Sequence, residues 1–187
     1  MAKFFNWDVT TESVHDMYGH PINGYNRIVK TDSGSTLNVA KDSYYPIYNS
    51  VFEDVVGTLV EDLDCTVTSQ GEFRGGRWIY TQFENDEFLN TVIPGDKHGE
   101  IKGYGTLVNS HDGSLAFRFY IGMVRIWCQN TFMSSYSGKD NRNGLSVKHT
   151  RNHRDKIDSF SEKIVDIKNS QQDIYKTMEE MTNKVNW

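Results

Sequence analysis

The sequence predicts an α+β protein: an antiparallel sheet built from β-hairpins packs with helices, and a long C-terminal helix with a heptad pattern follows. Runs of strand-forming residues flank short turns that contain glycine, as β-hairpins require. Between these runs, apolar residues recur every three or four positions, as on one face of a helix. The last part of the chain keeps this helical spacing and shows no strand signal.

The first segment, 1–20, is polar and aromatic without clear periodicity, and we expect it to form an N-terminal arm. Two strand-forming runs, 25–31 and 35–40, flank a turn that contains Gly34 and predict a hairpin. The predicted parts of the chain are an arm at 1–20, an α+β core domain at 21–147 and a long helix at 148–187, which is also a possible oligomerisation segment.

A helix is predicted after Pro46, where apolar side chains follow the helical spacing up to Leu63. Asn49 and Ser50 are the candidate residues to cap its start. The outward face has no lysine or arginine, and its acids are Glu53, Asp54, Glu61 and Asp62. Such a face would suit contact with a partner protein.

Two further hairpins are predicted at 66–84 and 100–124, each with a turn that contains glycine. The second turn holds an Asp-Gly pair, in which both residues tolerate positive φ. A loop at 94–99 separates the hairpins, and a short helix at 125–136 leads into a flexible segment at 137–144.

The C-terminal pattern is typical of a coiled-coil seam sustained for roughly four heptads. A helix from about 153 to 183 would be about 45 Å long, which is longer than a small domain usually covers. We expect part of it to pack on another copy or another protein, although a helix lying across its own sheet fits equally well. The residues assigned to this oligomerisation seam are Ile157, Phe160, Ile164, Ile167, Ile174, Met178 and Met181.

The formal net charge of −5 argues against indiscriminate nucleic-acid binding. Residues 118–156, however, contain eight bases and two acids, a balance that suits contact with phosphates. Aromatic side chains of the same segment (Trp127, Phe132 and Tyr136) would supply base stacking, while a solvated basic face is the equally weighted alternative. The candidate nucleic-acid-binding residues are Arg125, Trp127, Lys139, Arg142, Lys148, His149, Arg151 and Arg154.

The composition predicts a protein of the cytoplasm. No run of about 18 apolar residues is present, so a membrane span is not expected. The first residues lack the apolar stretch of a signal peptide. Cys65 and Cys128 form no CxxC pair, and we expect buried, reduced thiols rather than a disulfide framework.

No phosphate-binding loop, nucleophile elbow or zinc peptidase motif is present, so we predict no enzymatic activity, no cofactor and no metal. His111 and Asp112 could serve as a base or a metal pair, although a hairpin turn explains them better. His149 and His153 have helical spacing, but phosphate-facing or solvated imidazoles are favoured over zinc. Arg125, at a helix start, suits either a phosphate contact or a buried ion pair.

The strings at 109–114 (NSHDGS) and 124–132 (VRIWCQNTF), followed by 148–150 (KHT), resemble motifs of the phage/plasmid-like protein family. The strand motif at 76–78 (GRW) agrees with the same order. That family is a prophage and plasmid family described as a domain of unknown function. The resemblance therefore implies a phage-encoded protein in a host cytoplasm, and it implies no particular activity.

A hairpin-rich sheet followed by a helix is also similar in element order to the single-strand annealing proteins of recombination. In those proteins, subunits assemble into rings or filaments that hold single-stranded DNA along a basic groove. This weaker resemblance implies a homo-oligomer that binds and anneals single-stranded DNA without catalysis. The alternative function is a protein-interaction module, such as an accessory or anti-defence factor that binds a host protein.

Overall fold

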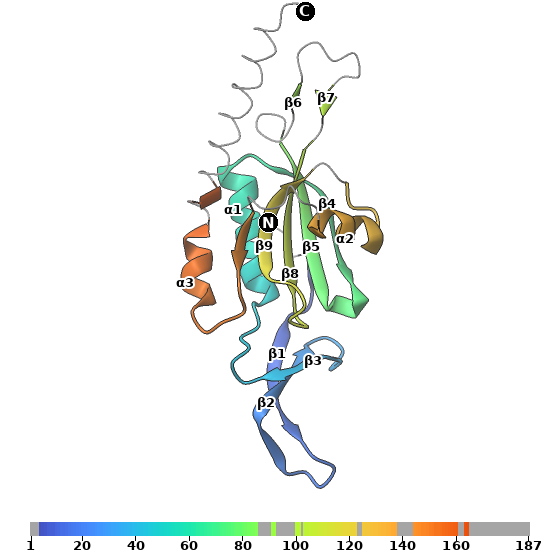
Figure 1. The fold of residues 1–187 in the computed structure, drawn as a ribbon, viewed down its shortest axis with the longest axis vertical. Helices are drawn as coiled ribbons and strands as arrows, with labels where there is room; N and C mark the ends of the chain where they lie inside the picture. The colour runs from blue at the N-terminus through green and yellow to red at the C-terminus, as the bar shows by residue number, and fades with distance from the viewer. Residues whose placement is uncertain are drawn as a thin grey trace, which may run out of the picture.

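The computed structural model describes residues 4–85, 91–92, 100–101, 103–122, 125–137, 144–160 and 163–164. The strands are β1 (Val9–His15), β2 (Pro21–Lys30), β3 (Thr36–Lys41), β4 (Thr66–Phe73), β5 (Trp78–Glu84), β6 (Thr91–Val92), β7 (Glu100–Ile101), β8 (Tyr104–Ser110), β9 (Phe117–Gly122) and β10 (Leu145–Val147). The helices are α1 (Asn49–Asp62), the 3-10 turn η1 (Arg74–Gly76), α2 (Gln129–Ser137) and α3 (His153–Asp158). Antiparallel sheets packed with helices confirm the α+β class (Figure 1).

The main sheet has five antiparallel strands in the order β10-β9-β8-β5-β4, so β4 and β10 are its edges. Because side chains alternate along a strand, the sheet has two faces with different partners. Ile79 and Phe83 of β5 pack with α1 and α3, whereas Trp78 and Tyr80 of the same strand pack with α2. Among the described residues, no helix has the length and apolar character needed to cross a bilayer.

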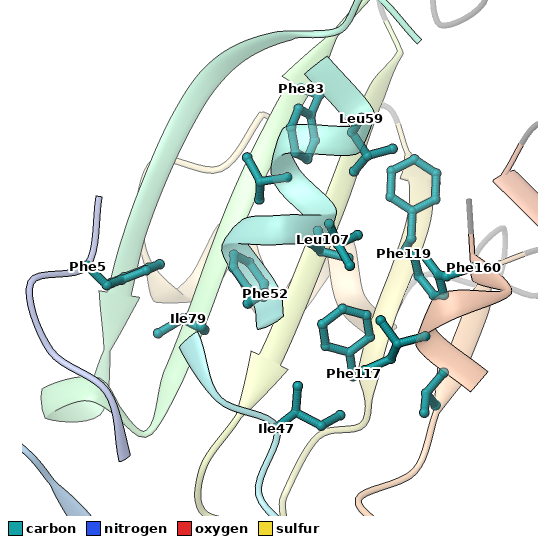
Figure 2. Close-up of a cluster of buried hydrophobic side chains, with 14 of the residues drawn as sticks. Phe5, Ile47, Phe52, Leu59, Ile79, Phe83, Leu107, Phe117, Phe119 and Phe160 are labelled. Atoms are coloured by element: carbon teal, nitrogen blue, oxygen red, sulfur yellow. The ribbon is translucent and has the colours of Figure 1, made fainter. Parts of the chain in front are cut away.

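The larger apolar cluster lies between α1, α3 and the sheet. Figure 2 shows Phe52 and Leu59 of α1 placed over Phe83, Leu107 and Phe117 of three neighbouring strands. All five side chains are fully buried. Burying one such side chain is worth about 2 kcal/mol, so this cluster is a main source of the stability of the fold.

Three residues assigned to the intermolecular seam belong to this same cluster. Ile157, Phe160 and Ile164 are 5%, 1% and 1% exposed, and the ring centroids of Phe160 and Phe117 are 5.4 Å apart. These side chains are covered by their own chain, which agrees at these positions with the alternative of a helix that lies across its own sheet. Helical spacing identifies an apolar face but not its partner. The other assigned residues (Ile167, Ile174, Met178 and Met181) lie outside the described part of the chain.

A three-stranded sheet of order β1-β2-β3 precedes the main sheet and extends away from it as a ribbon (Figure 1). The expected hairpin between β2 and β3 is present, with Gly34 at a φ of +68° in its turn. The sequence did not predict β1, which pairs with β2 from Val9 opposite Lys30. Ile28 and Leu37 are buried at the base of the ribbon, whereas residues 15–25 at its tip are exposed.

The start of α1 is capped from the N-terminal segment and not by its own residues. The Asp8 carboxylate accepts hydrogen bonds from the backbone N–H groups of Asn49 (2.8 Å) and Ser50 (3.2 Å). Tyr48 occupies the cap position, and its side chain makes no capping hydrogen bond. The prediction that Asn49 or Ser50 caps the helix is therefore wrong, because a carboxylate from a distant residue satisfies the free amides.

Candidate nucleic-acid interface

Two buried histidines each contact a buried asparagine. The first pair, His111 and Asn49, connects the β8–β9 turn to the start of α1. His111 Nε2 lies 2.8 Å from Asn49 Oδ1, and the Asn49 amide donates to the carbonyl of Trp7 at 3.0 Å. Since the amide NH₂ of Asn49 donates to a carbonyl, its Oδ1 faces the ring and accepts, so the His111 Nε2 carries a proton. The His111 Nδ1 is buried and has no hydrogen-bond partner among the described residues.

His149 repeats this arrangement beside β8. Its Nε2 lies 2.9 Å from Asn109 Oδ1, and the Asn109 amide donates to the carbonyl of Ile47 at 2.9 Å. The Tyr44 ring stacks on the imidazole with centroids 5.0 Å apart, and its hydroxyl donates to the carbonyl of Ser110. Asn49 and Asn109 therefore each join segments that are far apart in sequence.

Burial keeps both imidazoles uncharged. Loss of solvation, together with the nearby His149, lowers the pKa of His111 to about 3. Loss of solvation and the nearby His153 lower the pKa of His149 to about 4. Near neutral pH neither ring adds positive charge, and His149 is only 9% exposed. The structure thus places His149, a predicted nucleic-acid contact, inside the fold.

Within residues 109–114, Ser110 and Asp112 make the local hydrogen bonds of the turn. The Ser110 hydroxyl donates to the carbonyl of Leu115 and accepts from its N–H. Asp112 accepts from the N–H of Ser114 at 3.0 Å, and Gly113 has a φ of +73°. Among the described residues, no group of three or more histidine, cysteine, aspartate or glutamate side chains is placed to hold a metal ion. The turn reading of His111 and Asp112 agrees with this geometry.

On the opposite face of the sheet, the segment before α2 holds an exposed tryptophan on a fixed backbone. Ile126 is buried, and its N–H donates to Gln82 Oε1 of β5 at 2.9 Å. The Thr131 hydroxyl oxygen accepts from the N–H groups of Trp127 (2.9 Å) and Cys128 (3.0 Å). The backbone of Trp127 is held from both sides, while its side chain is 72% exposed.

An arginine lies over one face of this ring. The Arg125 guanidinium lies 4.4 Å from the centroid of the Trp127 ring, within the range of a cation–π contact. Arg125 is exposed, so the alternative that it forms a buried ion pair does not hold. A planar cation beside an open aromatic face can bind a phosphate and stack on a base at neighbouring positions of one strand.

Two more arginines lie against aromatic rings on the α2 side. The Arg74 guanidinium is 3.8 Å from the Trp78 ring centroid, and Arg118 lies 5.6 Å and 5.5 Å from the rings of Tyr120 and Tyr136. The sequence analysis did not single out Arg74 or Arg118 as sites. Neighbouring aromatics were visible around each, but only the pairing of β4, β5 and β9 brings them to one face.

The helix α2 is anchored by aromatic packing. Phe132 is fully buried, and its ring centroid lies 5.4 Å from Phe73, 5.6 Å from Trp78 and 5.9 Å from Tyr80. Phe132 is thus part of the core and unavailable for base stacking, and Tyr136 packs on it in a stacked geometry. Of the three aromatics expected to stack on bases, Trp127 is the one with an open ring.

Cys128 does not follow the expectation of a buried thiol. It is exposed, whereas Cys65 is buried. Hydrogen bonds from the backbone and hydroxyl of Thr131 and from the backbone of Asn130 lower the pKa of the Cys128 thiol. The start of α2 therefore favours negative charge, as helix starts do.

The predicted binding residues that the structure describes lie on two different faces of the sheet. Arg125 and Trp127 lie together before α2, whereas Lys148, Arg151 and Arg154 are exposed around α3, which packs on the other face of the sheet. Lys139 and Arg142 lie outside the described residues. A run of charge along the chain suggests one patch, but α2 packs on one face of the sheet and α3 on the other.

Comparison with known proteins identifies the family of the chain. No curated protein and no solved structure matches the chain. One family model, the domain of unknown function DUF932, matches residues 36–185. The match includes both buried histidines and all of α2, and it covers well over half of the sequence. The chain belongs to the DUF932 family.

Proposed function

We propose that this protein is a phage-encoded binder of single-stranded nucleic acid that acts without catalysis. The surface that binds is the one before and beside α2, with Arg125 and Trp127 at its centre. The main observation in support is an exposed tryptophan whose backbone is held by hydrogen bonds and whose ring lies against an arginine. A ring that is held in place before binding loses little conformational entropy when a base stacks on it.

Charge on this side supports the proposal. The helix α2 contains no charged residue, and Arg74, Arg118 and Arg125 lie over aromatic rings on the same side of the sheet. The acids of α1 lie on the other face of the sheet. A net negative protein can therefore offer a locally positive surface to a phosphate backbone. We further propose that the bound strands are annealed to complementary strands during recombination.

Two variants separate the two contributions. Trp127→Ala should weaken binding of an oligothymidylate by about 5-fold to 150-fold, which corresponds to about 1–3 kcal/mol for one stacked base, without changing the salt dependence. Arg125→Ala should reduce the slope of log affinity against log salt by about 0.7, because one phosphate contact is lost. Fluorescence anisotropy with a labelled oligonucleotide at several salt concentrations measures both.

Matched controls exist elsewhere in the molecule. Tyr18→Ala removes a 75% exposed aromatic from the ribbon, and Arg154→Ala removes an exposed arginine from α3. With an oligothymidylate short enough to contact a single copy, both controls should bind like the wild type. If Trp127→Ala and Arg125→Ala bind like the wild type while Arg154→Ala does not, the interface lies at α3 and the proposal for α2 is refuted.

A second candidate function is a protein-interaction module that engages a host protein. It is favoured by the ribbon, where five of the large exposed apolar side chains gather: Met17, Tyr18, Ile22, Tyr25 and Val39. Exposed apolar side chains concentrated on a protruding element are typical of protein contacts. Wild-type protein that binds no single-stranded oligonucleotide at low salt would favour this function over the first.

A further inference from the structure

A groove runs along the acidic side of α1, next to the edge strand β4. It has a volume of about 530 Å³. Its apolar lining comes from Phe4, Val56 and Val67, and Phe4 is 51% exposed. Its charged lining comes from Glu53, Asp54 and Glu61, and no lysine or arginine is among the described residues that line it. Ser50, Thr58 and Gln70 add neutral polar atoms to the lining, so the groove combines apolar surface with negative charge.

The opposite edge of the same sheet has the opposite charge. Lys148, Arg151, Arg154 and Lys156 follow the edge strand β10 and are exposed, against the exposed acids Asp155 and Asp158. No ion pair joins these four bases to another described residue. In Figure 2, Phe160 next to α3 and Phe5 near the groove lie on opposite sides of α1. One chain therefore cannot place its own α3 cations in its own groove.

We propose that the α1–β4 groove of one copy takes the β10–α3 turn of a second copy. Arg154 of that turn pairs with Glu61, and Arg151 pairs with Asp54. The aliphatic parts of both arginine side chains cover the apolar side chains of the groove. A foreign basic peptide has the same charge, but the chain itself displays a surface complementary to its groove. This selects a second copy as the occupant.

The geometry of this contact is head-to-tail. Each copy uses its groove for one neighbour and its turn for another, so association continues into a ring or a filament. Single exposed ion pairs contribute little, and salt screens them, so assembly depends on several pairs acting together and weakens as salt rises. The α2 surface lies on the other face of the sheet and stays open, so this inference does not rest on nucleic-acid binding.

The test is a charge swap in the full-length chain, read by sedimentation velocity at low and high salt. Wild type should form species larger than a monomer at low salt and dissociate at high salt. Glu61→Lys and Arg154→Glu should each weaken assembly about tenfold or more, because each places like charges opposite one another. The double variant should recover assembly, since the swapped pair is again complementary. Asp42→Lys, the same charge change on the ribbon, is the control and should assemble like the wild type.

Four outcomes would overturn the proposal. A wild type that stays monomeric at low salt has no such contact. Assembly that persists in both single variants uses another surface. A double variant that is folded by circular dichroism and still does not assemble shows that the two positions do not meet. A synthetic peptide of residues 144–158 should inhibit assembly. If a lysine-rich peptide of unrelated sequence inhibits it equally well, the groove binds any basic peptide and is not specific for a second copy.

Discussion

Acid should destabilise this fold through its two buried histidines. Both have a pKa below the unfolded value of about 6.5, at about 3 for His111 and about 4 for His149. The unfolded chain therefore binds more protons than the folded chain in this range, and the free energy of unfolding falls as the pH drops below about 6.5. Above about pH 6.5 the two rings are neutral in both the folded and the unfolded chain, so they do not lower the free energy of unfolding there.

The magnitude follows from the shifts. Between about pH 7 and about pH 5, each histidine lowers the free energy of unfolding by about 2 kcal/mol, so the pair contributes at most about 4 kcal/mol. At a typical urea slope of about 2 kcal/mol per molar, the unfolding midpoint should move down by up to about 2 M. Most carboxylates titrate below this range, so the window isolates the histidines.

The assay is urea unfolding followed by circular dichroism at a series of pH values. His149→Gln keeps an N–H donor for Asn109 and removes the titrating ring, so it should lose about half of the pH dependence. His20→Gln changes an exposed side chain and is the control, which should keep the wild-type dependence. A wild-type midpoint that is the same at both pH values would refute the account of the buried pair.

Three packing and hydrogen-bond predictions follow from the same structure. Phe132→Ala should cost about 3–5 kcal/mol and lower the midpoint of thermal unfolding by about 10 °C, since it empties the aromatic cluster under α2; an unchanged midpoint contradicts this. Ile164→Asp should lower the free energy of unfolding by about 3 kcal/mol or more, because it buries an unpaired charge; wild-type stability in calorimetry would favour an intermolecular role for this residue. Asn49→Ala should cost about 1–3 kcal/mol by removing the acceptor of His111, and wild-type stability in urea would contradict that.

The sequence predicted features that are set by local chemistry. The turns at Gly34 and Gly113 have positive φ, and the hairpins around them form as expected. The hairpin predicted at 66–84 forms from β4 and β5, which begin and end at these residues, because strand-forming residues and glycines are adjacent in the chain there. The start of α1 was found from the apolar spacing after Pro46. Each of these signals lies within a few residues.

Features that depend on distant pairing were missed. β1 is polar and half exposed, and it is a strand because β2 pairs with it. The cap of α1 comes from Asp8, which lies 41 residues before Asn49. Arg74 and Arg118 reach one side of the sheet only through strand order. For the same reason, charge along the chain placed Arg125 and Arg154 in one patch, although they lie on opposite faces.

The most direct test of the proposed interface follows the indole N–H signal of Trp127 by nuclear magnetic resonance during titration with an oligothymidylate. The signal is assigned as the one lost in Trp127→Phe. Base stacking should shift it strongly, whereas the signal of Trp78 should change little, because its indole is buried and bonded to Ser114. Saturating oligonucleotide that leaves the Trp127 signal in place would contradict the assignment of α2 as the nucleic-acid surface.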